Sequence, residues 1–284
     1  MAETHHSAKE TRLNMARLSW LAYQSPDVVN QQWQTCQKLP EAECGDWTPL
    51  KAASEPPQFA TCAASDAQAY AFKMGGCTET PLILACRGTS SIQDAMVDAS
   101  LALVPFEFAD GKQKTGVCVH KGFYQQFKGI LPQVDLLYKG HLAGGGMLLC
   151  TGHSLGSGIA ALAALYYAEQ FPQQVAYIGF GTPRVGNPAL VKTFNTVVLD
   201  RSRVANGRDP INKVPPPVGY AHVGAEVHIG RPDPYPAIPL FTDIPDHDIL
   251  QGYVRGLQTD APQANAIPRS HANWLSCAMS AFHG

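Results

Sequence analysis

Residues 152–156 read Gly-His-Ser-Leu-Gly, a G-x-S-x-G pentapeptide with a serine at its centre. The short apolar run 147–150 precedes it, and the Ala- and Leu-rich segment 157–170 follows it. A strand, a sharp turn and a helix form the context in which such a serine is presented as a nucleophile. Chance is the alternative for so short a pattern, and the flanking segments argue against it. Ser154 is therefore expected to project from the turn, beside helix N–H groups that favour a developing negative charge.

A nucleophilic serine needs a base within hydrogen-bonding reach, and the base needs an acid that fixes its tautomer. In α/β-hydrolases the chain order is Ser, then Asp or Glu, then His, so the acid is sought after Ser154. The run 203–205 predicts a strand, and Asp209 follows on a turn made rigid by Pro210. Asp209 is the candidate acid. An ordinary turn aspartate before proline is the alternative, and position alone leaves it open.

Four histidines follow the candidate acid far enough from the terminus to be held rigidly, and they are His222, His228, His247 and His271. His222 and His228 lie in a strand-like segment, so we expect them to be ladder or surface residues. His247 lies in a loop just before a helix-like segment, where the ring can swing toward the serine. It is the candidate base, and His271 in a later helix-like segment is the reserve.

The hydrophobic pattern predicts elements that would position these side chains. We expect strands at 82–86, 117–120, 147–150, 175–180, 203–205 and 221–229, and helices at 122–138, 157–170, 188–195, 248–257 and 269–282. Strands that alternate with helices predict an α/β fold, with a mostly parallel central sheet and helices on both faces. No repeat or linker divides the 284 residues, so 1–284 is expected to form a single domain.

The N-terminal part of the chain has a different pattern. Residues 8–23 predict a helix that ends at Pro26, and residues 27–57 are polar and irregular. We therefore expect 1–58 to be a helix and an irregular segment packed on the domain. Residues 59–64 and 69–74 then predict a strand hairpin around a Ser-Asp turn.

Composition excludes several classes of protein. The net charge of −2 gives no attraction to nucleic acid. No run of 18 apolar residues occurs, so no transmembrane segment is expected. The polar N-terminus lacks the apolar core of a signal peptide. A cytoplasmic location, export by another route and a mature secreted chain all stay open, as does the oligomeric state.

The even count of eight cysteines raises the possibility of disulfides, and their pairing stays open. Cys86, Cys118 and Cys150 lie inside apolar strand-like runs and are expected to be buried thiols. Cys36 and Cys44 flank a loop-like segment and are a plausible pair. No C-x-x-C pair occurs, so no zinc site is expected, and no residue pattern calls for a metal or another cofactor.

Six segments together resemble the class 3 lipases, the fungal-type triacylglycerol lipases and their plant and bacterial relatives. The segments are 86–92, 119–123, 151–161, 180–187, 206–216 and 247–257, and they recur in the family's order over roughly residues 60–257. The resemblance implies an α/β-hydrolase fold. It also implies that Ser154 is the nucleophile, Asp209 the acid and His247 the base.

The same resemblance implies an oxyanion hole formed by Thr89 and the backbone N–H of Leu155. A tetrahedral intermediate needs two preorganised donors, and Thr89 offers both a hydroxyl and an N–H at the end of an apolar strand. A strand-end threonine with a packing role is the alternative. Arg87 and His120 also match the family pattern, and we expect both to be structural. His153 is expected to pack in the turn.

In this family a lid follows the oxyanion residue, and here it is expected at 90–109. The candidate lid and substrate-binding residues are Ile92, Met96, Leu103, Val104 and Phe106. Such a lid covers an apolar acyl pocket in water and opens at a lipid surface. A fixed surface helix with its apolar side in the core is the alternative. The segment departs from many relatives at Ala95, where a bulky aromatic residue is frequent.

These expectations favour a serine-dependent carboxylic ester hydrolase, a lipase that cleaves acylglycerols through an acyl-enzyme on Ser154. The substrate would be a lipid or ester at a lipid–water interface, and no cofactor is needed. Phospholipase A1 and soluble-ester esterase activities stay open, because the triad cannot separate them. A catalytically inactive lipid-binding scaffold is the alternative from a different class, and the intact triad argues against it. A secreted toxin that attacks membranes is permitted but has no positive support.

Overall fold

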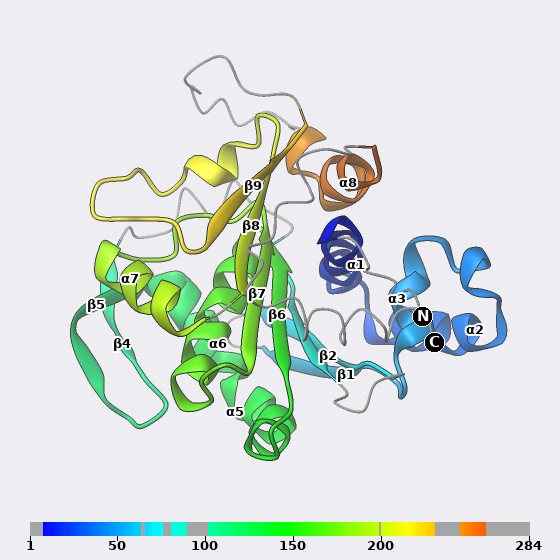
Figure 1. Ribbon diagram of the computed structural model, residues 1–284, viewed down its shortest axis with the longest axis horizontal. Helices are drawn as coiled ribbons and strands as arrows, with labels where there is room; N and C mark the ends of the chain where they lie inside the picture. Colours follow the sequence, from blue (N-terminus) through cyan, green and yellow to red (C-terminus); the bar gives the residue numbers. More distant parts are fainter. Residues whose placement is uncertain are drawn as a thin grey trace, which may run out of the picture.

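The computed structural model describes residues 8–63, 66–75, 81–89, 102–198, 200–230 and 245–259 (Figure 1). A seven-stranded sheet with the order β1-β2-β3-β6-β7-β8-β9 forms the centre. Its strands are β1 (Gln58–Cys62), β2 (Ala67–Lys73), β3 (Leu82–Cys86), β6 (Leu148–His153), β7 (Val175–Phe180), β8 (Asp200–Asn206) and β9 (Ala225–Ile229). Strands β1, β2 and β3 pair antiparallel, and from β3 onward every pairing is parallel. The expected hairpin and the mostly parallel sheet are confirmed.

Helices cover both faces of this sheet, as expected. They are α1 (Ala8–Leu21), α2 (Pro26–Lys38), α3 (Thr48–Ala52), α5 (Lys121–Ala143), α6 (Leu155–Gln170), α7 (Pro188–Val197) and α8 (Arg255–Thr259). Figure 1 shows α5, α6 and α7 on one side of the sheet and α1, α3 and α8 on the other. Two apolar clusters fill the two interfaces, one under α5 and α6 and one under α1.

The central strands are apolar because both of their faces are covered. Every residue of β6 and β7 is buried, which is typical of parallel strands between two helical layers. Helix α6 is buried around almost its whole circumference, so its small alanines let it pack closely on the sheet. The sequence predicted these elements well because a continuous apolar run is itself the signal of double-sided burial.

The segment 27–57 was expected to be irregular, and the structure corrects this. It contains α2, α3 and the short 3₁₀ helices η1 (Glu41–Glu43) and η2 (Gly45–Trp47). Ser25 caps α2 by accepting a hydrogen bond from Val28 N, and Pro26 occupies its first turn. Val29 and Cys36 are the only buried residues of α2. Such a short apolar stripe is a weak signal in a polar sequence, which is why the helix was missed.

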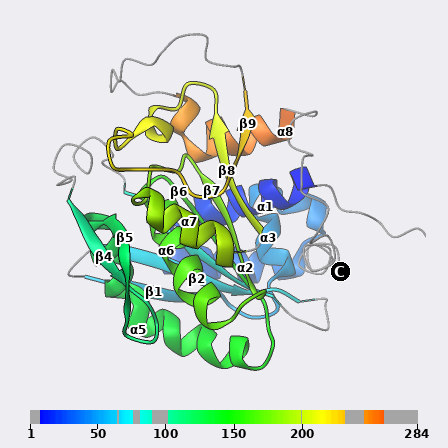
Figure 2. The ribbon, with the colours of Figure 1, turned by 60° about the vertical axis from the view of Figure 1, so that its left-hand side comes forward.

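The second part of the expected lid is a strand. β4 (Leu103–Glu107) pairs antiparallel with β5 (Gln113–His120) in a hairpin beside α6 and α7 (Figure 2). Phe106 is completely buried, and its ring packs against those of Phe108, Tyr124 and Phe127. Leu103, Val104 and Phe106 therefore belong to a packed hairpin, because two aromatic rings of α5 hold it in place. Ile92 and Met96 lie outside the described residues.

The outer edge of the sheet is closed by a side chain. Gln133 of α5 accepts a hydrogen bond from Thr61 N at 3.1 Å and donates one to Thr61 O at 2.6 Å. The amide of Gln133 thus takes the place of a neighbouring strand at this point of β1.

The C-terminal part of the described chain also differs from expectation. The predicted helix 248–257 is a π-helix, η5 (Ile249–Val254), followed by α8, and a 3₁₀ turn, η4 (Pro245–His247), precedes it. The predicted strand 221–229 starts later, at Ala225 in β9. The predicted helix 269–282 lies outside the described residues. Within the described residues, no helix is both long and apolar enough to cross a membrane.

Candidate active site

Ser154 lies on the turn that joins β6 to α6. Its φ of 57° and ψ of −130° are a strained backbone conformation for a side-chain-bearing residue. Ser154 N donates to Phe180 O at 2.9 Å, which ties the turn to β7. A Cβ at Gly152 would lie 2.5 Å from the backbone of Gly156, and one at Gly156 would lie 2.3 Å from Cys86 O. Both glycines are therefore required for strand and helix to meet.

The candidate oxyanion residues flank this turn. Leu155 is the first residue of α6, so its N–H belongs to the free donors of the helix start. Thr89 follows the end of β3. A Cβ at Gly88 would lie 2.7 Å from His153 O, which shows how closely the backbone before Thr89 approaches the turn. The structure thus brings the segment of Thr89 and the N-terminus of α6 to the same end of the sheet as Ser154.

His247 and Asp209 form a buried pair. The distance from His247 Nδ1 to Asp209 Oδ1 is 2.8 Å, and the exposed fractions of the two residues are 7% and 1%. The carboxylate also accepts hydrogen bonds from Ile211 N at 2.8 Å and from Tyr253 Oη at 2.5 Å. Because an ionised carboxylate only accepts, Nδ1 of His247 carries the proton in this pair.

The other ring nitrogen of His247 is left as an acceptor. Nε2 is buried and has no hydrogen-bond partner among the described residues. A buried polar atom without a partner costs free energy, and at this position it is free to accept a hydrogen bond or a proton from another group. An imidazole that donates from Nδ1 to a carboxylate and keeps Nε2 as an acceptor is the arrangement that a general base requires.

The backbone around His247 is fixed on both sides. Before it, Asp246 Oδ2 accepts from Arg208 N at 2.7 Å, and Asn206 Nδ2 donates to Asp246 O at 3.0 Å. After it, Asp248 Oδ1 accepts from two N–H groups of η5 at 2.8 and 2.6 Å. The sequence suggested a loop in which the ring could swing. The structure shows instead a segment clamped to the turn that carries the candidate acid.

His153 packs under the pair, as expected for a residue of the turn. Its Nε2 donates to His247 O at 2.8 Å, and its Nδ1 accepts from Tyr23 Oη at 2.9 Å. The centroids of the His153 and His247 rings are 4.5 Å apart. Burial, and next the proximity of His247, hold the pKa of His153 well below its usual value. His153 is therefore neutral, and it supports the backbone of His247.

Two tyrosines of this site were missed by sequence reasoning. Tyr253 contacts the candidate acid, and Tyr23 contacts His153. Burial raises the pKa of both hydroxyls, so both stay protonated donors. For Tyr253 a signal existed, because it lies within the family-like segment 247–257. Tyr23 follows α1 and had no such signal.

The structure places His222 outside the pair. Its Nε2 lies 2.7 Å from Asn212 O. Burial, and then the charges of Arg203 and Arg184, lower the pKa of His222 to about 3. His222 is therefore a neutral, partly buried residue near two arginines, and it faces neither carboxylate oxygen of the candidate acid.

The other candidate histidines, and the other residues that match the family pattern, are described next by their contacts. His228 Nδ1 lies 3.9 Å from the carboxylate of Glu226, and His271 lies outside the described residues. His120 Nδ1 accepts from two backbone N–H groups at the start of α5. Arg87 donates to a side chain of β2 at 2.6 Å. Contacts of this kind are structural, as expected for both residues.

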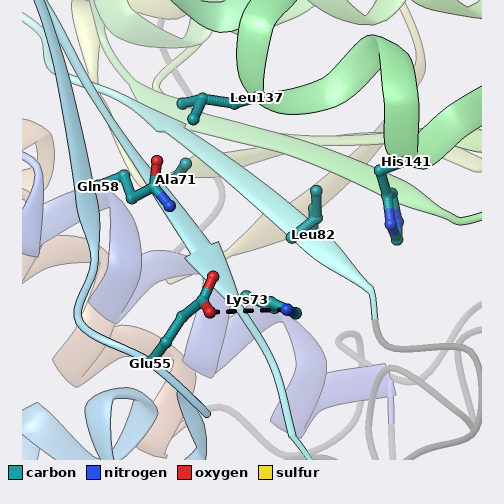
Figure 3. Close-up of a pocket in the computed structure, with 7 residues that line it drawn as sticks. All are labelled: Glu55, Gln58, Ala71, Lys73, Leu82, Leu137 and His141. Carbon is teal, nitrogen blue, oxygen red and sulfur yellow. Dashed lines mark ion pairs between the residues drawn. The ribbon is translucent and has the colours of Figure 1, made fainter.

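A cavity of about 200 Å³ lies near the end of the sheet that is opposite to the turn of Ser154 (Figure 3). Glu55, Lys73 and His141 line it, and the first two form an ion pair at 3.5 Å. Leu82, another lining residue, pairs in register with Leu148, the first residue of β6. The candidate nucleophile follows the last residue of β6, so this cavity is separate from the candidate active site.

Comparisons with known proteins agree with this geometry. Residues 83–219 match the lipase (class 3) family. The chain is 30% identical over 171 residues to a lipase from Rhizopus niveus, which covers 57% of this chain and 41% of that protein. It is also 30% identical over 161 residues to a secreted mono- and diacylglycerol lipase A from Penicillium camembertii, covering 55% and 50%. The chain thus spans half or less of these curated relatives.

Solved structures extend the likeness to most of the chain. Lipase II from Rhizopus niveus has a TM-score of 0.64 at 23% identity, covering 78% of this chain and 80% of that structure. A fungal lipase–inhibitor complex has a TM-score of 0.63 at 22% identity, covering 87% and 96%. At these identities the likeness establishes the fold, which is the α/β-hydrolase fold with a mostly parallel sheet.

Proposed function

Because residues 83–219 match the lipase (class 3) family, we propose that this chain is a serine-dependent lipase that cleaves acylglycerols. The matched relatives include a lipase and a mono- and diacylglycerol lipase, which supports acylglycerols as the substrate class. A solved neighbour at 24% identity is described as a triacylglycerol lipase whose catalytic centre is a serine protease triad.

One observation of this chain carries the proposal. His247 is held by Asp209 through Nδ1, and its buried Nε2 has no partner among the described residues. His222 and His228 each also have one buried ring nitrogen without a partner among the described residues. His247 differs from both because its other nitrogen lies at hydrogen-bonding distance, 2.8 Å, from a carboxylate. We infer that Nε2 of His247 accepts the proton of Ser154.

The acylation step then follows from these groups. Ser154 Oγ attacks the ester carbonyl carbon while its proton moves to His247 Nε2. Asp209 stabilises the imidazolium, and the oxyanion accepts from the N–H of Leu155 and from Thr89. As the C–O bond breaks, the imidazolium returns the proton to the leaving alcohol, and the acyl group stays on Ser154.

Deacylation uses the same groups with water as the nucleophile. Water loses its proton to His247 Nε2 as its oxygen attacks the acyl carbonyl. The second tetrahedral intermediate collapses, and the proton passes from His247 to Ser154 Oγ. A fatty acid is released and the enzyme is regenerated without a metal or other cofactor in any step.

A movable lid remains part of this proposal. The hairpin of β4 and β5 anchors the C-terminal end of the expected lid, because the ring of Phe106 is buried in the core. We propose that the lid proper lies before Leu103 and includes Ile92 and Met96. Replacing both by serine should lower activity on emulsified substrate relative to dissolved substrate.

Phospholipase A1 and esterase activities share the triad, so substrate profiling must separate them. Purified protein should be assayed on p-nitrophenyl esters of two to eighteen carbons, on triolein and on a phosphatidylcholine. We expect hydrolysis of triolein and of long-chain esters, and a steeper rise in rate once a short-chain triglyceride passes its solubility limit. Preference for phosphatidylcholine would instead favour a phospholipase, and activity only on dissolved short esters would favour an esterase.

The inactive scaffold is tested separately with a serine-reactive phosphonate. We expect the probe to label the wild-type protein and to leave Ser154→Ala unlabelled. Wild-type protein that binds lipid vesicles but takes up no phosphonate and hydrolyses no ester would contradict an enzymatic function.

A further inference from the structure

Two buried cysteines lie close together in the N-terminal layer, by which we mean the elements from α1 to α3. Cys36 lies near the end of α2 and Cys44 lies between η1 and η2, and their exposed fractions are 1% and 4%. Cys44 Sγ lies 3.9 Å from Cys36 O, which belongs to the residue that carries the other thiol, and Cys36 Sγ lies 3.8 Å from Trp47 O. Both are present as free thiols in the structure.

A second pair of buried cysteines shows why this contact is distinctive. Cys86 and Cys150 are buried on the neighbouring strands β3 and β6. In that pairing Cys150 lies opposite Leu84, and Cys86 lies opposite Gly152. Residues two positions out of register on neighbouring strands do not present their Cβ atoms to each other as a disulfide requires. Burial of two cysteines on neighbouring strands is therefore not enough to place them for a disulfide.

We propose that Cys36 and Cys44 form a structural disulfide that closes a short loop within the N-terminal layer. In the oxidation each thiol gives up its hydrogen, and one Sγ–Sγ bond forms. A small-molecule disulfide such as oxidised glutathione takes up the two electrons and two protons and leaves as two thiols. The staple joins α2 to the segment between η1 and η2.

The burial of the pair determines when the bond forms. Burial first, and then contact with Cys44, raise the pKa of Cys36 to about 12. A thiolate is the reactive form, so the folded, reduced protein reacts slowly with an oxidant at neutral pH. The disulfide therefore forms while the chain folds, and burial then protects it from reductants.

The staple supports the region that holds the candidate base. Asp46, two residues after Cys44, accepts from Arg255 Nη1 at 3.0 Å and from Nη2 at 2.7 Å. Arg17 Nε of α1 lies 3.5 Å from the same carboxylate. Arg255 begins α8 directly after η5, which carries the tyrosine that donates to Asp209. The N-terminal layer thus braces the segment that follows the candidate base, whatever the substrate is.

Peptide mapping tests the bond directly. Protein should be refolded from the reduced, denatured state in a buffer of oxidised and reduced glutathione, alkylated and cleaved with trypsin without reduction. Trypsin separates the two residues, because Cys36 lies in the peptide 18–38 and Cys44 in the peptide 39–51, each with a single cysteine. We expect these peptides to be linked. Cys62 and Cys118, which are half-buried, should be recovered alkylated.

Recovery of 18–38 and 39–51 as separate alkylated peptides would overturn the proposal. Linkage of either peptide to another cysteine would overturn it as well. Folded, reduced protein exposed to the same buffer should acquire the bond far more slowly than refolding protein does. A fast reaction of the folded protein would contradict the structural role and indicate a reactive thiol.

Thermal unfolding tests the stapling effect. Closing a loop of this length should raise the Tm of the oxidised protein by roughly 5–10 °C over the reduced protein. The double variant Cys36→Ser/Cys44→Ser should show one Tm with and without reductant, and the control Cys62→Ser should keep the wild-type difference. A wild-type Tm independent of reductant would overturn the proposal. None of these readouts depends on ester hydrolysis, so failure here and failure of the proposed function are distinguishable.

Discussion

The hydroxyl of Tyr253 donates a hydrogen bond to Asp209 Oδ2 at 2.5 Å, while His247 Nδ1 lies 2.8 Å from Oδ1. The carboxylate of Asp209 is thus held by donors on both oxygens. Tyr253 belongs to η5, only six residues after His247, so one short segment supplies both the candidate base and a hydrogen-bond donor to the candidate acid.

Tyr253→Phe removes this donor with little change in shape. A hydrogen bond to a charged group is worth about 1.5–3 kcal/mol, so we expect kcat to fall roughly tenfold, with a smaller effect on KM. Steady-state kinetics on p-nitrophenyl butyrate would measure both constants. A lower Tm with an unchanged kcat would show that Tyr253 stabilises the fold without orienting Asp209.

His247→Ala should abolish turnover, because no other described histidine contacts Asp209. Loss of a triad member costs on the order of 10⁴-fold or more in rate. The matched control is His228→Ala, since His228 is half-buried and lies 3.9 Å from Glu226. We expect the control to keep its activity on a dissolved ester. The assignment fails if the two variants have similar rates.

The free energy of unfolding should decrease as the pH falls below about 6.5, in part because of His222. Burial and two arginines lower its pKa to about 3 in the folded state. The unfolded chain binds this proton at higher pH, so the contribution of His222 is fully present above pH ~6.5 and is lost as the pH falls toward 3. His222→Gln keeps a donor for Asn212 O and does not titrate. Its Tm should depend less on pH between 6.5 and 4 than the wild-type Tm, and parallel curves would exclude this role.

Gly156→Ala should prevent folding or lower the Tm severely. The new Cβ would lie 2.3 Å from Cys86 O, and backbone atoms cannot yield as a flexible side chain does. Gly140→Ala is the matched control, because Gly140 lies in α5 with no atom within 4 Å of the added Cβ. Alanine favours a helix by about 0.5–1 kcal/mol over glycine, so the control should be slightly more stable. Equal Tm values for both variants in thermal unfolding would contradict the tight fit of the turn.

The sequence predicted the elements whose pattern is local. The glycines of 152–156 and the apolar runs of β6 and β7 locate the turn of Ser154, because steric fit and burial leave direct traces in residue type. Contacts between residues that are far apart in the sequence leave no such signal in the residue types. Tyr23 and His153 are 130 positions apart, and no periodicity connects them.

The helices between residues 26 and 57 were missed for a related reason. Helix α2 has only Val29 and Cys36 buried, so its amphipathic stripe is too short to stand out from a polar background. The π-helix η5 was also out of reach, since the pattern of 248–257 is compatible with an ordinary helix. Its true form depends on the cap by Asp248 and on packing against α1.

The pairing of Gln133 with Thr61 has a consequence for the protein at high concentration. An unpaired outer strand is a template onto which a strand of another molecule can add, and so it promotes aggregation. At Thr61 the side-chain amide of Gln133 already occupies both backbone groups. When molecules are crowded together, as on the surface of an oil droplet, a strand of a neighbouring molecule therefore cannot pair with β1 at this point.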